Sequence, residues 1–155
     1  MANPKGYMLD TSIVEPGIVF QENDLIVEAF NVPHGMISPA YGYKITTSDK
    51  TIAISGDTSF SEEVARQSIG ADFLFQEVLS EAGLSIRSEE WQNYHNPAHT
   101  VSSDVAAIAK AAKPSKLILY HGLFFGALEH SVIAEIRDAG YDGDVVLAND
   151  LDVFD

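Results

Sequence analysis

Residues 51–58, Thr-Ile-Ala-Ile-Ser-Gly-Asp-Thr, join a short apolar run to a polar turn. An apolar run without polar alternation is typical of a strand that is covered on both faces. Later segments of the chain have the same character: Asp72–Phe75, Lys116–Tyr120 and Asp144–Ala148. Together with Thr51–Ser55 they predict a sheet that is at least partly parallel.

Two further strands are expected upstream, at Leu25–Val32 and Gly42–Thr47. The residues numbered 47–50, Thr-Ser-Asp-Lys, form a turn-prone tetrad. We therefore expect Lys44–Thr47 and Thr51–Ser55 to pair as a hairpin.

Helical patterns separate the apolar runs. They are Glu63–Ile69, a helix that Ser102 or Ser103 can cap and that runs to about Ala112, and Leu128–Ala139. Ser59 and Glu62 have the spacing of a capping box, and Gly70 is placed to end the first helix. Val105, Ile108, Ala109 and Ala112 would form the apolar stripe of the second helix. Alternating strands and helices predict an α/β fold, in a single domain over residues 1–155 or one piece of a larger one.

Composition excludes several classes of protein. The 155 residues include 9 Lys and Arg against 23 Asp and Glu, a net charge of −14, and no basic stripe is visible. A nucleic-acid partner is therefore unlikely, because such proteins replace the counterions along the phosphates with basic side chains. The absence of cysteine excludes disulfides and thiolate chemistry. No apolar run reaches the ~18 residues of a membrane span, so we expect no membrane association.

Polar residues with metal-binding or acid–base chemistry follow several predicted strands. His34 follows Val32-Pro33, Asp57 follows the Thr51–Ser55 run, and His121 follows Lys116–Tyr120. Gln76-Glu77 follows Asp72–Phe75 in the same way, while His95 and His99 lie in the loop before the second helix. Sites in α/β sheets form beyond the carboxyl ends of strands. His34, Asp57 and His121 would suit zinc, or manganese or iron.

Each of these residues also has an ordinary structural explanation. A histidine beside a strand end is often a hydrogen-bonded structural residue, and Asp57 can bond the amides of its own turn. Glu77 can be a solvated strand end. None of them belongs to a short local metal motif, so their spacing leaves both explanations open.

The amino-acid sequences of these motifs resemble those of one protein family. Ser55-Gly56-Asp57-Thr58 after a buried strand resembles the SGDT element of the metallo-β-lactamase superfamily. Further elements follow in the order of its ribonuclease Z-like branch; they are residues 32–35 (VPHG), 41–45 (YGYKI), 69–77 (IGADFLFQE), 95–100 (HNPAHT), 117–126 (LILYHGLFFG) and 150–154 (DLDVF). The resemblance covers about Glu15 to Asp155 and implies part of an αββα sandwich, with a mixed sheet and helices on one face.

The resemblance also implies roles for particular residues. His34, Asp57 and His121 correspond to metal ligands, with Asp57 shared between two divalent ions and therefore catalytic. Zinc is the expected metal, and manganese or iron are alternatives. His99 corresponds to the histidine that stabilises or protonates the departing oxygen. Glu77 and His95 correspond to residues that support these groups.

The sequence also departs from the family. The HxHxDH motif, which supplies most of the metal ligands, is absent, and Gln76 stands where a histidine is usual. The family's long basic arm for tRNA is missing too. We therefore expect the C-terminal portion of the fold, acting on a small-molecule substrate and inactive or nearly so as an isolated chain.

Three interpretations remain open. The first is part of a hydrolase in which a metal-bound hydroxide attacks an ester, phosphodiester or lactam-type bond. The second is a non-catalytic half-fold that acts by homodimerisation or by complementation with a separate N-terminal half. The third is a plain truncation. A cytoplasmic location is expected, because residues 1–6 lack the apolar region of a signal peptide, although a targeting signal could lie in a preceding segment.

Overall fold

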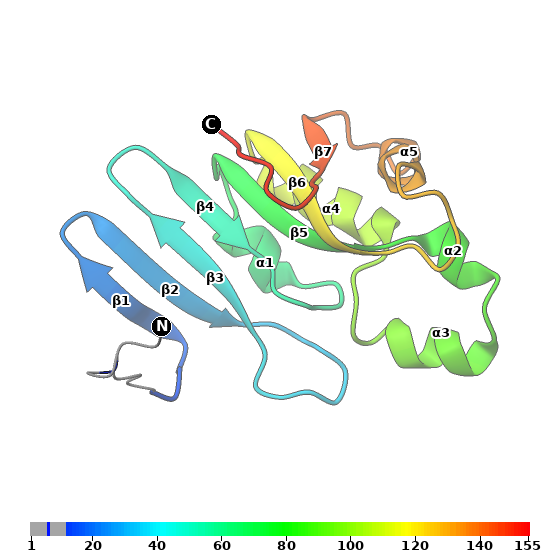
Figure 1. Cartoon of the computed structure of the whole chain (residues 1–155), viewed down its shortest axis with the longest axis horizontal. Helices are drawn as coiled ribbons and strands as arrows, with labels where there is room; N and C mark the ends of the chain where they lie inside the picture. The colour runs from blue at the N-terminus through cyan, green and yellow to red at the C-terminus, as the bar shows by residue number, and fades with distance from the viewer. Residues whose placement is uncertain (1–5, 7–11) are drawn as a thin grey trace.

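A single mixed sheet forms the centre of the molecule (Figure 1). The computed structural model describes residue 6 and residues 12–155. The sheet has seven strands in sequence order: β1 (Gly17–Glu22), β2 (Leu25–Asn31), β3 (Tyr41–Thr46), β4 (Thr51–Ile54), β5 (Phe73–Leu79), β6 (Lys116–Leu123) and β7 (Val145–Leu147). The α/β fold class and the mixed sheet predicted from the sequence are confirmed.

The strand pairing changes from antiparallel to parallel at β4. Strands β1 to β4 form an antiparallel meander, in which Lys44 pairs with Ala53 across the expected hairpin. Strands β4 to β7 are parallel. Parallel neighbours require crossover connections, and these contain α1 (Glu62–Gln67), α4 (Ser102–Ala112) and α5 (Ser131–Asp138).

The hydrophobic core lies between the sheet and these three helices. Leu74, Val78, Leu117 and Leu119 project from β5 and β6 into a buried cluster that includes side chains of α1, α4 and α5. The predicted stripe of α4 is buried throughout. Each fully buried aliphatic side chain contributes roughly 1.5–3 kcal/mol, so this cluster holds the helices on one face of the sheet.

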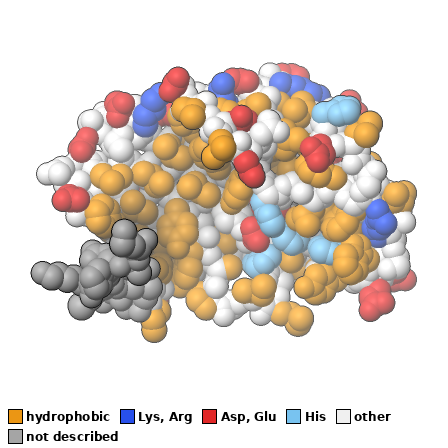
Figure 2. Space-filling view, viewed as in Figure 1, with side chains coloured by type: hydrophobic (Ala, Val, Ile, Leu, Met, Phe, Trp, Pro, Cys, Tyr) orange, Lys and Arg blue, Asp and Glu red, His pale blue; other side chains and the backbone are white. Residues whose placement is uncertain are grey.

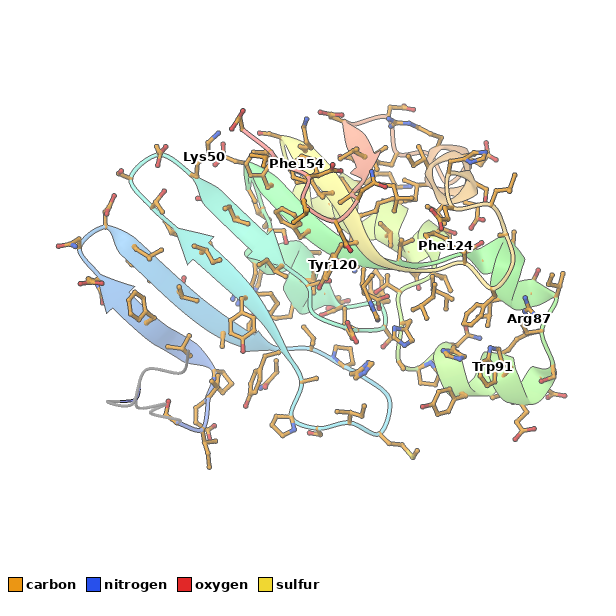
Figure 3. All side chains as sticks on the ribbon, in the orientation of Figure 1. Lys50, Arg87, Trp91, Tyr120, Phe124 and Phe154 are labelled. Atoms are coloured by element: carbon orange, nitrogen blue, oxygen red, sulfur yellow. The ribbon has the colours of Figure 1, made fainter. Side chains whose placement is uncertain are left out.

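The opposite face of the sheet carries no helix among the described residues (Figure 1). Cross-strand registers place Tyr43, Ile54, Phe75 and Ile118 in one row on this face. The C-terminal segment, which carries Phe154 (Figure 3), covers part of it. The Phe154 ring lies 6.0 Å from the Phe75 ring. We call this surface the open face.

The starts of α1 and α5, and the role of Ser102 at the start of α4, differ from those predicted. Ser61, not Ser59, caps α1, because its side chain accepts a hydrogen bond from the Val64 amide. Helix α4 begins at Ser102 without a side-chain cap, and the Ser102 hydroxyl instead donates to Glu135. Helix α5 begins at Ser131, later than the predicted Leu128.

Glu135 joins three helices through one carboxylate. From α5 it accepts hydrogen bonds from the Ser80 hydroxyl and the Glu81 amide, at 2.8 and 2.9 Å, at the start of α2 (Glu81–Ser85). It also accepts the Ser102 hydroxyl at the start of α4. A carboxylate near a helix N-terminus is stabilised by unpaired amides and the helix dipole, so Glu135 is well placed at the start of α2, where it accepts the Glu81 amide.

Strands β5 and β6 are longer than predicted, so two of the predicted site residues lie inside a strand. Glu77 lies within β5 and His121 within β6, whereas both were expected after their strands. Helix α3 (Glu89–His95) and the short α2 were not predicted, and His95 is the last residue of α3 rather than part of a loop. In the part of the chain that the structure describes, no helix has the length and apolar character needed to span a membrane.

Candidate metal centre

The structure brings the predicted site residues together at the carboxyl edge of the parallel strands. The ring centroids of His34 and His99 are 5.3 Å apart, and those of His99 and His121 are 5.9 Å apart. His121 Nε2 lies 3.4 Å from Asp57 Oδ2. Figure 2 shows histidine side chains gathered around an acidic side chain on this face. Segments distant in sequence thus form one cluster of imidazoles and carboxylates.

His34 is held by the loop that precedes α4. Its Nδ1 lies 2.7 Å from the Ala98 carbonyl, to which it donates, and the Gly35 amide donates to the Pro97 carbonyl at 2.8 Å. Gly35 has φ +55°, a left-handed conformation that glycine adopts without strain. With Nδ1 protonated toward Ala98, Nε2 keeps its lone pair for a metal ion, the usual arrangement of a ligating histidine.

Asp57 lies in the loop that leaves β4. Gly56 has φ +65°, and a Cβ at this position would lie 2.4 Å from the Tyr41 carbonyl oxygen. The glycine of the Ser55-Gly56-Asp57-Thr58 element is therefore required by a close backbone approach. It lets the chain turn so that Asp57 faces His121.

His121 occupies a β-bulge in β6. Glu77 pairs with Tyr120 and Val78 with Gly122, so His121 has no partner on β5 and its φ is +45°. A bulge redirects the side chain of the extra residue, and a left-handed φ strains a residue that has a Cβ. The His121 and Asp57 side chains are 46% and 42% exposed, so the imidazole and the carboxylate meet at an accessible surface.

Glu77 is fully buried behind this cluster. Its Oε1 accepts hydrogen bonds from the amides of Thr58, at 3.2 Å, and Thr100, at 2.9 Å. His99 Nδ1 lies 3.4 Å from the same oxygen, which is longer than a well-formed hydrogen bond. The interaction with Glu77 raises the pKa of His99, against the opposing effect of burial. Glu77 therefore ties the Asp57 loop to the His99 loop.

His95 is buried in an aromatic cluster next to His99. Its ring centroid lies 4.7 Å from that of Trp91, 4.8 Å from Phe125 and 5.7 Å from His99. Neither ring nitrogen has a hydrogen-bond partner among the described residues. Burial, assisted by the charge of His99, lowers the pKa of His95. His95 thus packs against His99 without a hydrogen bond to it.

The donor set fits a zinc-type centre in kind but falls short in number. Imidazole nitrogens and a carboxylate are ligands that zinc prefers, and His34 presents a free nitrogen to the cluster. Within residues 12–155, however, no group of three or more ligating side chains is positioned to hold one ion. A catalytic zinc usually has three protein ligands. The described residues would therefore supply only part of such a centre.

Several functional contacts were not predicted from the sequence. Thr58 and Thr100 donate to Glu77, and the Ala98 carbonyl orients His34. These residues lie within the motifs SGDT and HNPAHT, so those motifs were the sequence feature that could have indicated the contacts. A cavity of about 400 Å³ next to His34 and His99 was also missed, because its walls come from segments distant in sequence.

Comparison with known proteins identifies the fold. The chain is 30% identical to Ribonuclease Z of Limosilactobacillus fermentum over 108 residues, 68% of this chain and 32% of that protein. The solved structure of the metallo-β-lactamase fold protein YhfI from Bacillus subtilis matches 84% of this chain and 48% of its own, with 21% identity and a TM-score of 0.68. The short form of human tRNase Z matches 89% of this chain and 44% of its own, with 20% identity and a TM-score of 0.62. No protein-family model matches the chain.

The chain therefore has the metallo-β-lactamase fold, of which it represents a part. Within that fold its sequence is ribonuclease Z-like, as the motifs predicted. The chain spans about a third of that ribonuclease Z and less than half of the two solved structures.

Proposed function

We propose that this chain supplies the C-terminal part of the active site of a metal-dependent hydrolase that cleaves a phosphodiester bond in a small molecule. The observation that carries the proposal is the convergence of His34, Asp57, His99 and His121 at one edge of the sheet. The similarity to proteins named for ribonuclease activity favours a phosphodiester over the ester and lactam-type alternatives. The net charge of −14 favours a small substrate over a polynucleotide.

In this proposal His34, Asp57 and His121 hold two divalent ions, zinc before manganese or iron. Bound in this way, the ions would provide a hydroxide at neutral pH and offset negative charge on the scissile group. Ala98 keeps the His34 ring oriented, and the bulge in β6 keeps His121 facing Asp57. Because the described residues lack a third ligand for either ion, the isolated chain is expected to be inactive or nearly so.

His99 would deliver a proton to the departing oxygen. Its Nδ1 faces the buried Glu77 carboxylate, which fixes the ring and leaves Nε2 for the substrate. A positioned general acid contributes about 10²–10⁴-fold to the rate. His95 packs beside this ring and limits its movement.

Zinc titration by calorimetry tests the ligand assignment. Wild-type chain should bind zinc more tightly than Asp57→Ala and His121→Ala, while His130→Ala, which changes an exposed histidine outside the cluster, should bind as wild type does. Equal binding by all four proteins would contradict the assignment. Turnover of bis-para-nitrophenyl phosphate by the pure chain, lost in Asp57→Ala, would overturn the expected inactivity.

The reaction itself is tested on a longer product. If the reading frame remains open upstream of Met1, the longer protein should hydrolyse bis-para-nitrophenyl phosphate only when zinc is present, and Asp57→Ala should abolish turnover. A longer protein that binds zinc and cleaves neither this diester nor an ester or lactam probe would contradict the proposal.

A second function is favoured by the open face: a non-catalytic half-fold that acts by association. The described face presents half-buried Val27, Tyr43, Ile45, Ile52 and Ile54 with no helix over them. Such apolar surfaces mark association sites, so a second copy or a separate N-terminal half would cover it. Light scattering should then give a dimer that Ile45→Asp dissociates, and a well-behaved wild-type monomer that binds no N-terminal half would refute this function.

A further inference from the structure

A pocket adjoins the histidine cluster on the side of α3. Its volume is about 400 Å³, within the roughly 300–1,000 Å³ range of small-molecule sites. Its walls include His34, Met36, Ile37, Asn93, Tyr94 and His99. Two of these are histidines of the candidate metal centre, so the pocket and the centre share a wall.

The lining selects for a neutral occupant. None of the described residues that line the pocket is Lys, Arg, Asp or Glu. Apart from the two histidines, the polar side chains are those of Asn93 and Tyr94. Away from the two histidines, a charged group would lose its hydration here without gaining an ion pair, whereas an apolar or aromatic group would be stabilised.

The apolar walls are exposed in the absence of an occupant. Met36 is 96% exposed, Ile37 61% and Tyr94 64%. Tyr94 is held in place because its ring stacks on Trp91, with centroids 6.3 Å apart. Exposed apolar side chains that converge on one concave surface mark a binding site more often than scattered ones do.

The pocket is fixed relative to the histidines by backbone contacts. The Ile37 amide donates to the His34 carbonyl at 2.9 Å, closing the turn that carries Met36 and Ile37. The same turn is anchored to Pro97 and Ala98 through the hydrogen bonds of Gly35 and His34. A group bound in the pocket is therefore held at a defined distance from His34 and His99.

We propose that this pocket binds a neutral aromatic substituent of the substrate, next to the bond that is broken at the metal centre. The inference rests on the proposed hydrolase and narrows its substrate class to aryl-substituted small molecules. It assigns Ile37 and Tyr94, which line the pocket together with the histidines, to substrate selection.

Binding of a neutral aromatic probe tests the inference without metal or turnover. We would titrate para-cresol into labelled wild-type chain and follow the amide resonances by NMR, with inorganic phosphate as the anionic counterpart. Para-cresol should shift the amides of Ile37 and Tyr94, and phosphate should not. Ile37→Asn should weaken para-cresol binding about fourfold, equivalent to the ~0.8 kcal/mol transfer energy of one methylene group.

Ile69→Asn is the matched control, because Ile69 is 68% exposed and lies outside the pocket. It should bind para-cresol as wild type does, and Tyr94→Ser, which changes another lining residue, should weaken binding if Ile37→Asn does not fold. No binding by wild type, or equal binding by the pocket variants and Ile69→Asn, would overturn the inference. Since these readouts need no metal, failure of the hydrolase proposal would be seen separately, in the zinc and turnover experiments.

Discussion

Replacing Glu77 should loosen the candidate site as well as destabilise the fold. The carboxylate is fully buried and accepts the amides of Thr58 and Thr100. In Glu77→Ala both amides lose their acceptor. A buried donor left unpaired costs about 1–3 kcal/mol, so the two together cost about 2–6 kcal/mol. That range is a large part of the ~5–15 kcal/mol stability of a typical domain.

Glu77→Gln separates the charge from the hydrogen bonds. An amide oxygen can still accept both donors, but it forgoes the extra strength of a charged acceptor, about 1 kcal/mol per bond. We therefore expect Glu77→Gln to lose about 2 kcal/mol and to remain folded, which makes it the variant for detailed measurement.

Denaturant unfolding gives the stability, and amide hydrogen exchange locates the effect. Exchange should accelerate at Thr58 and Thr100 in Glu77→Gln beyond the change at other core amides. The control is Val78→Ala, at a neighbouring buried position on the helix side of the sheet, which should cost about 1.5–3 kcal/mol through lost burial without a selective change at these amides. A loss below about 1 kcal/mol in Glu77→Ala, or uniform exchange in Glu77→Gln, would refute the reasoning.

Three further predictions concern the backbone and the helix junction. Gly56→Ala should destabilise far more than Gly70→Ala, measured by thermal melting, because both have a left-handed φ but only at Gly56 would a Cβ meet a backbone oxygen; similar losses would contradict the close approach. At the bulge, His121→Gly should be about 1 kcal/mol more stable than His121→Ala in urea, since glycine relieves the left-handed strain; equal stabilities would argue against strain there. Glu135→Ala should cost about 1–3 kcal/mol and increase proteolysis near the start of α2, which unchanged stability and cleavage would disprove.

Local sequence patterns determined most of the sheet and the core helices. The apolar run Thr51–Ser55 predicted β4, the stripe containing Val105 and Ile108 predicted α4, and Gly70 marked the region where α1 ends. These features depend on side-chain periodicity and on the conformational preference of glycine, which are properties of a short segment. Strand β1 was missed, and its six residues are all exposed.

Tertiary structure decided where the elements begin and end. Ser61 rather than Ser59 caps α1. Each of these serines shortly precedes an acidic residue, so the local sequence does not distinguish them, and the packing of the folded chain decides which one caps the helix. Ser102 was a predicted cap, yet its hydroxyl bonds Glu135 of α5, a distant partner that no local pattern reveals. Likewise, the extension of β5 through Glu77 depends on hydrogen bonds to β6.

The sequence by itself named the residues of the candidate site: His34, Asp57, His99 and His121, with Glu77 behind them. Their motifs and order along the chain were sufficient for that. Only the tertiary structure decided how they meet, through the bulge at His121 and the two amide bonds of Glu77. The physical reason is that such geometry depends on backbone pairing between segments far apart in the chain, whereas a motif records only which side chains are neighbours in sequence.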